Sequence, residues 1–199
     1  MGIVKLTKTG FKSSTYEKYD SFLAGNTAFS PNSYESIATT TVGSGGVADI
    51  TFSSIPSTYE HLQIRIIAKN TVADYETKMQ VGNGSVDTGS NYADHYLLGN
   101  GASTFANATT SATGAIIGIE GNTANNYSAY ICDILDYKNT NKYKTFRTLN
   151  GVDKNGSGSV RLQSGLWQST SAINIIKLSH SVGNFEQYTQ AALYGIKGV

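Results

Sequence analysis

Three histidines and one acidic stretch are the residues of this chain whose types could support metal binding or proton transfer. The histidines, His61, His95 and His180, lie far apart in the sequence, whereas a zinc site usually contains closely spaced pairs of His or Cys. The acidic stretch comprises Asp74, Glu76, Asp87 and Asp94, followed directly by His95. Its spacing differs from that of a calcium-binding loop, so we interpret it as a polar connection between strands, with an ion site as the alternative.

A nucleophilic or phosphate-binding site is not indicated by the sequence. The Gly-x-Ser-x-Gly motif of a hydrolase elbow does not occur, and the nearest segment, Gly43-Ser44-Gly45, has the wrong spacing. Residues 43–46 lead into a strand-like segment rather than into the helix N-terminus that binds phosphate. With 14 acidic residues, carboxylate pairs of the glycosidase type carry little information. We therefore predict a protein that is not an enzyme and needs no cofactor, with a glycan hydrolase as a remote alternative.

Aromatic and basic residues alternate between positions 137 and 147, and this mixture could contact a sugar. The rings of Tyr137, Tyr143 and, further along, Trp167 have flat apolar faces with polar rims. If residues 143–151 form a strand, however, alternate side chains lie on opposite faces, and a solvated strand face explains the charges. A tryptophan within a strand is also more often part of a core, so glycan contact is the alternative interpretation.

The lone cysteine, Cys132, has no partner for an internal disulfide. It lies in the apolar run 129–134, where a free cysteine usually behaves as a small buried hydrophobic residue. We therefore expect it to be part of the core rather than a reactive thiol.

The elements that would position these residues are strands. Charged residues make up 15% of the chain, the net charge is +1, and 21 glycines and 13 tyrosines accompany only two prolines. This composition excludes a coiled coil and argues against disorder, and the near-zero charge argues against a nucleic-acid partner. No segment approaches the roughly 18 apolar residues of a membrane helix, and the N-terminus does not resemble a secretory signal.

The clearest strand covers residues 62–68, where Leu62, Ile64 and Ile66 share one face and Gln63 and Arg65 the other. Further candidate strands cover residues 37–42, 47–52, 77–81, 92–98, 115–120, 127–137, 143–151, 158–168, 172–180 and 188–196. Their spacing, with Gly- and Asn-rich turns between them, predicts an all-β antiparallel two-sheet sandwich resembling a jelly roll. We interpret the Ala/Ser/Thr/Asn-rich stretch 102–113 as a surface loop. Residues 82–91, 99–114 and 121–127 are expected to be loops that the sandwich exposes for binding.

Residues 1–34 show little of the strand-like alternation found in the rest of the chain. We predict that they form an N-terminal attachment arm and that residues 35–199 form the sandwich domain. Ser14 and Glu17 have the spacing of a capping box, and Tyr16, Tyr19 and Phe22 then recur at helical spacing. Gly25 follows as a stop signal. The pattern predicts a short helix with one aromatic face.

Segments at both ends of the chain resemble a group of structural proteins of tailed bacteriophages. The similar segments are FLAGN at 22–26, YESIA at 34–38, TVGSGG at 41–46, ITFSSIP at 50–56, YEHLQIR at 59–65 and ALYGIK at 192–197. Members of this group are fibre, decoration or other virion components, so the resemblance implies a part of a virion rather than an enzyme.

The resemblance implies that the chain docks on other virion proteins, as capsid decoration or cement or as a fibre component. We expect a homo-oligomer, a homotrimer in particular, located in the virion. Aromatic residues of the arm would anchor it by burial at the interface: Tyr16, Tyr19, Phe22 and Phe29. The alternative is a receptor- or carbohydrate-binding module of a tail fibre.

Overall fold

The computed structural model describes residues 33–72 and 75–198, which form strands, turns and loops. The chain divides into two units between Ser33 and Tyr34, and the strands belong to the second unit. The strands are β1 (Tyr34–Thr41), β2 (Asp49–Phe52), β3 (His61–Ala68), β4 (Tyr75–Asn83), β5 (Ser85–Val86), β6 (Tyr92–Gly99), β7 (Thr104–Ala112), β8 (Ala115–Glu120), β9 (Ser128–Ile134), β10 (Lys144–Asp153), β11 (Gly158–Trp167), β12 (Ile175–His180) and β13 (Gln190–Ile196). None of the described residues belongs to a helix that could cross a membrane.

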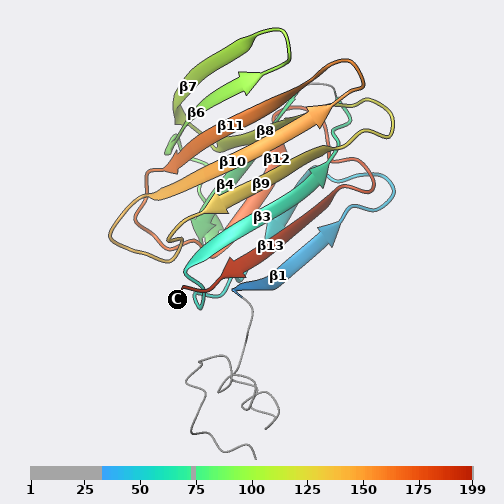
Figure 1. Ribbon diagram of the computed structural model, residues 1–199. Helices are drawn as coiled ribbons and strands as arrows, with labels where there is room; N and C mark the ends of the chain where they lie inside the picture. Colours follow the sequence, from blue (N-terminus) through green and yellow to red (C-terminus); the bar gives the residue numbers. More distant parts are fainter. Residues whose placement is uncertain (1–32, 73–74, 199) are drawn as a thin grey trace, which may run out of the picture. The chain divides into compact units, whose positions relative to one another are not determined.

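The strands form two antiparallel sheets that pack face to face (Figure 1). The larger sheet has eight strands in the order β1-β13-β3-β9-β10-β11-β6-β7, and the smaller has the order β2-β12-β4-β5, with β8 also paired to β4. The predicted all-β two-sheet sandwich is therefore confirmed. It is larger than the eight-stranded jelly roll that we expected it to resemble, but the chain crosses repeatedly between two sheets, as a jelly roll does.

Strand β3 shows why the sequence folds in this way. Leu62, Ile64 and Ile66 are buried toward the smaller sheet, whereas Arg65 and Ile67 on the opposite face are exposed. The strand pairs along its length with β13 on one side and β9 on the other. Alternating apolar residues thus place one face of a central strand in the core, as predicted for residues 62–68.

The core between the sheets contains large apolar side chains from both layers, among them Phe146 of the larger sheet and Met79 and Leu178 of the smaller one. Cys132 on β9 lies among them, and burial raises the pKa of its thiol to about 12. The prediction that this cysteine is a buried hydrophobic residue is confirmed.

Two segments expected to be loops contain strands. Residues 102–113 contain β7, which pairs antiparallel with β6 from Thr104 to Ala112, and residues 82–91 contain the two-residue strand β5. The surface-loop interpretation of residues 102–113 was wrong because most side chains of β7 are exposed on both faces. An edge strand of this kind has no buried face and therefore no apolar alternation in its sequence.

Candidate functional site

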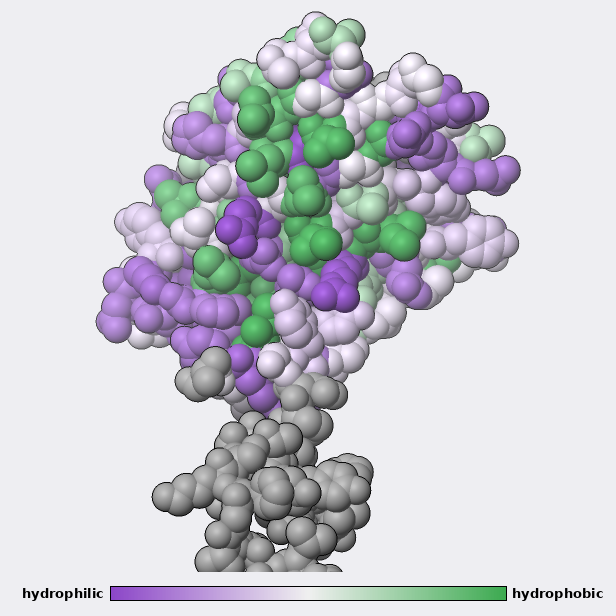
Figure 2. Space-filling view, in the orientation of Figure 1, coloured by the Kyte–Doolittle hydropathy of each residue, from purple (hydrophilic) through white to green (hydrophobic). Residues whose placement is uncertain are grey.

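The outer face of the larger sheet carries a row of four apolar side chains, which we call the apolar ridge. It consists of Leu97, Ile131, Leu149 and Leu162, whose exposed fractions lie between 45% and 55%. Figure 2 shows hydrophobic residues gathered over the central strands of this face. Soluble proteins expose single apolar residues routinely, whereas a contiguous row of large ones is a candidate interaction surface.

Strand register brings these four residues together. Leu149 on β10 lies opposite Ile131 on β9 and opposite Leu162 on β11, and Leu162 lies opposite Leu97 on β6. Directly paired side chains on one face of a sheet are neighbours. The apolar ridge therefore crosses four strands, a length of about 14 Å at the usual strand spacing.

A groove runs beside the apolar ridge, where three of the five residues in the next cross-strand row are alanine or glycine. In that row Ile67, Ala129, Gly151, Val160 and Gly99 lie opposite one another in turn. A Cβ atom built on Gly99 or Gly151 would meet no heavy atom within 4 Å, so these glycines leave open space above the sheet.

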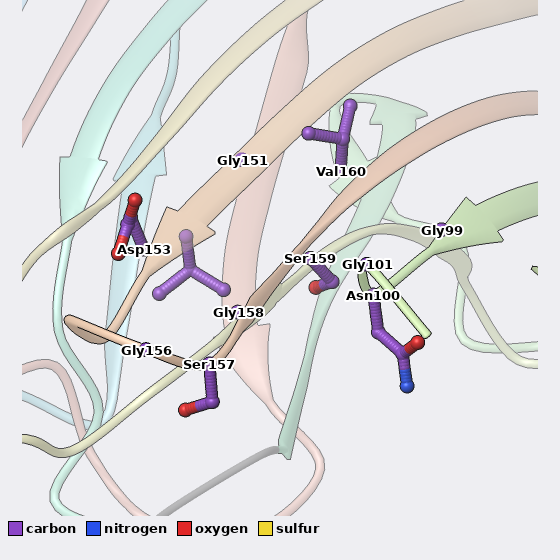
Figure 3. A pocket seen from close by; sticks show the side chains of 11 residues that line it. Gly99, Asn100, Gly101, Gly151, Asp153, Gly156, Ser157, Gly158, Ser159 and Val160 are labelled. Carbon is purple, nitrogen blue, oxygen red and sulfur yellow. The ribbon is translucent and has the colours of Figure 1, made fainter. Parts of the chain in front are cut away.

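Three hollows that share lining residues make up this groove. The largest, of about 550 Å³, lies between the ends of β6, β10 and β11 and is lined by Gly99, Gly151 and Val160 together with the turns that follow (Figure 3). The second shares Gly151 and Val160 with it and continues over Ala129 to the apolar ridge. The third shares Ala129 and Ile131 with the second and reaches Arg65 on β3.

Polar residues border the opposite side of the apolar ridge and bind one another. Gln63 Nε2 donates a 2.8 Å hydrogen bond to Asp133 Oδ1, and Arg147 Nη2 lies 3.3 Å from Asp133 Oδ2. Arg65 Nε donates to Gln63 Oε1, and its guanidinium lies 5.1 Å from the Tyr194 ring centre. These contacts hold the charges in a fixed row and leave the apolar ridge uninterrupted.

The inward face of the same strands is polar where the outward face is apolar. Arg161, between Val160 and Leu162, is buried, with Nη1 3.2 Å from Glu76 Oε1 and its guanidinium 3.8 Å from the Tyr96 ring centre. Asp94 is buried nearby, and burial is the main reason why its pKa is raised; the negative charge of Glu76 adds to this effect. The hydrogen bond from the Ile116 amide and the positive charge of Arg161 lower the pKa, but only in part.

No family model, curated protein or solved structure matches this chain.

The acidic stretch does not converge on one site in the described part of the chain. Glu76 pairs with Arg161, and Asp94 is buried beside them, whereas His95 points to the outer face of the larger sheet. Asp87 accepts hydrogen bonds from Trp167 Nε1 at 2.8 Å and from Asn91 Nδ2 at 2.9 Å. Asp74 lies outside the described residues, and among those described no three His, Cys, Asp or Glu side chains form a metal-binding group.

The other two histidines make structural contacts. His61 Nδ1 accepts a 2.9 Å hydrogen bond from the Asp136 amide. His180 is buried between the sheets, with Nε2 2.9 Å from Glu120 Oε2. Thr77 donates a 2.6 Å hydrogen bond to the other oxygen of Glu120 and contacts the Tyr130 hydroxyl. These residues bind one another inside the sandwich, although the buried Nδ1 of His180 has no hydrogen-bond partner among the described residues.

The predicted glycan-contact residues do not form a platform. Trp167 and Tyr137 are buried, and the Tyr137 hydroxyl donates to the Pro56 carbonyl. Only Tyr143 of the three is exposed. Trp167 and Tyr137 are therefore core residues whose rings cannot stack on a sugar in this structure. The interpretation of residues 143–151 as a solvated face also needs correction, because Lys144 points inward and donates to two backbone carbonyls.

The aromatic anchors predicted in the arm, Tyr16, Tyr19, Phe22 and Phe29, lie outside the described residues. The apolar ridge was not predicted, because its members come from four strands spread over more than sixty positions. Each strand taken alone shows only alternation. What brings them together is the pairing register, which no motif in the sequence reveals.

Proposed function

We propose that this chain is a structural protein of a tailed-phage virion and that it acts by docking the outer face of its larger sheet on neighbouring virion proteins. The apolar ridge is the observation that carries the docking proposal. The segments at both ends of the chain that resemble phage structural proteins support the virion context. The proposal covers both capsid decoration and a fibre component.

The chemistry of the face favours a protein partner. Burying the exposed half of one leucine stabilises a complex by on the order of 1 kcal/mol, so the four residues of the apolar ridge offer a useful binding energy. The polar row of Gln63, Asp133 and Arg147 beside it supplies the charged rim typical of protein interfaces. The groove gives room for side chains of the partner.

A binding role is favoured over catalysis by the way the described titratable side chains are used. Glu120 and His180 bind each other in the core, and Glu76 pairs with Arg161. The largest hollow is lined mainly by glycines and small polar residues (Figure 3). Sugar sites usually include an aromatic ring for stacking, and this hollow has none, so the carbohydrate-binding alternative has less support.

The proposal is tested by adding charge to the apolar ridge. We expect the double variant Leu149→Asp/Leu162→Asp to fold but to be lost from purified virions, as measured by immunoblotting, because the charges would be buried at the interface. The matched control, Thr145→Asp/Ser164→Asp, adds the same charge to exposed positions of the same two strands beside the apolar ridge. Charge at the polar rim of an interface stays solvated, so this variant should lose far less incorporation. Normal incorporation of the first variant would contradict docking by this face.

The arm provides a separate prediction. Deleting residues 1–30 should leave the sandwich folded and abolish incorporation if the arm attaches the protein. If the truncated chain enters particles while the variant of the apolar ridge does not, the sheet face alone provides attachment. Absence of the complete chain from purified virions would contradict the virion context itself.

A further inference from the structure

Strand β7 forms one edge of the larger sheet (Figure 1), and among the described strands its only partner is β6. Along the other side of an edge strand, the backbone N–H and C=O groups have no ladder partner, so the strand is a template for pairing with a further strand. Natural proteins usually prevent this with short strands, charges, bulges or covering segments.

The other edges have such protection. On β1 a bulge interrupts the register between Ser36 and Ala38, and Glu35 forms an ion pair with Lys197. β2 is four residues long and carries Asp49, which pairs with Lys177. β5 has two residues, and β8 is mostly buried against the larger sheet.

β7 has little of this protection. It is nine residues long, and its sequence, TFANATTSA, contains no charged residue and no proline. Its register with β6 is regular from Thr104 to Thr109, and the one irregularity lies at its far end, between Thr109 and Ala112. Eight of its nine residues are exposed.

We propose that two copies of this chain pair through β7, antiparallel and about a two-fold axis, to form one continuous sheet. This pairing closes at two copies, so it differs from the homotrimer expected from the resemblance to phage proteins. A second copy fits this edge better than a foreign strand does. Strand-adding sites that select a foreign peptide use pockets beside the edge, and none of the three hollows of the outer face includes a residue of β7. Self-pairing places only neutral side chains opposite one another, all of them small or medium-sized except Phe105, so no like charges meet.

The pairing would have a consequence for the outer face. A two-fold axis between antiparallel strands is perpendicular to the sheet, so both outer faces lie on the same side of the dimer. The apolar ridge ends at Leu97, whose partner on β7 is Ala106, and it would approach its symmetry mate across the new seam. The dimer thus presents two apolar ridges in one layer. This inference does not depend on the virion context.

The test is the mass of the complete chain in solution, measured by analytical ultracentrifugation over a range of concentrations. We expect a concentration-dependent dimer, of twice the 21.2 kDa chain mass. Ala106→Lys/Ala108→Lys should give a monomer, because the lysines of two copies would repel one another. Both side chains are exposed, so its melting temperature should equal that of the unmodified chain at concentrations where the unmodified chain is monomeric. The control Thr145→Lys/Ser164→Lys adds equal charge away from the edge and should remain dimeric.

Hydrogen exchange followed by mass spectrometry gives a second measurement on the unmodified chain. The amides of residues 104–109 that do not bond to β6 should become at least about 10-fold more protected at concentrations where the dimer forms, and the edge strand β1 should not change. A monomer at all concentrations, a trimer, or a dimer that survives the two lysines in β7 would overturn the proposal. Protection, in a monomer, of the β7 amides that do not bond to β6 would also overturn it, since another segment would then occupy the edge.

Discussion

The two faces of β10 and β11 differ in the polarity of their side chains, and the folding of the monomer alone does not explain this difference. Toward solvent, these strands present Leu149, Val160 and Leu162, all at least half exposed. Toward the smaller sheet, the same strands bury Arg161 and Asn150. A strand that served only the core would have the reverse arrangement. The inward polar residues are paired within the sandwich, whereas no described residue of the chain covers the outward apolar ones.

The first prediction compares opposite faces of β10 and has the largest expected effect. Phe146→Ala removes a fully buried ring and should lower the free energy of unfolding by about 4 kcal/mol, through lost burial and a cavity. Leu149→Ala, three residues along on the outer face, should change it by less than about 1 kcal/mol. Urea unfolding of both variants measures this difference. A similar loss in both would mean that the outer face also stabilises the monomer.

The second prediction concerns the buried polar contacts. Glu120→Ala leaves His180 and Thr77 without their partner inside the sandwich and should cost about 3 kcal/mol of folding stability. Glu60→Ala removes an exposed ion pair with Lys138 and should cost less than about 1 kcal/mol. If the two variants unfold at the same urea concentration, the inward polar residues contribute little to stability.

The third prediction uses two adjacent positions of β9 that face opposite ways. Cys132 is buried, with its pKa raised to about 12 by burial, so alkylation by iodoacetamide at pH 8 should be at least about 100-fold slower than for a free thiol. Ile131→Cys in a Cys132→Ser background should react at nearly the rate of a free thiol. Equal rates for the two positions would show that the assignment of the faces is wrong.

The fourth prediction, with the smallest effect, is a pH dependence. Because burial raises the pKa of Asp94 in the folded protein, the folded state holds this proton more tightly than the unfolded state. The contribution of Asp94 is therefore most favourable below its ordinary value of 3.8 and is lost as the pH rises through the raised pKa. Asp94→Asn should flatten the pH profile of stability in that window. An identical profile would show that Asp94 does not titrate in this way.

Sequence patterns predicted the fold better than the site. The alternation in residues 62–68 identified both the strand and its buried face, since β3 packs against a core on one side. Apolar and polar residues also alternate along β11, but here the apolar Val160 and Leu162 face outward and the polar Arg161 faces inward. The alternation alone therefore does not tell which face of β11 is buried. Residues 104–112 lacked even this signal, because an edge strand exposed on both faces needs no apolar residues. The apolar ridge depends on register between distant strands, which only the folded chain reveals.

The most direct test of the docking account is a virion map at a resolution that shows side chains. We predict that the chain will be found with the apolar ridge, Leu97, Ile131, Leu149 and Leu162, covered by a neighbouring virion protein. The groove over Gly151 should then hold side chains of that neighbour. A map in which the outer face of the larger sheet is open to solvent, and the chain is held only by other surfaces, would contradict the account.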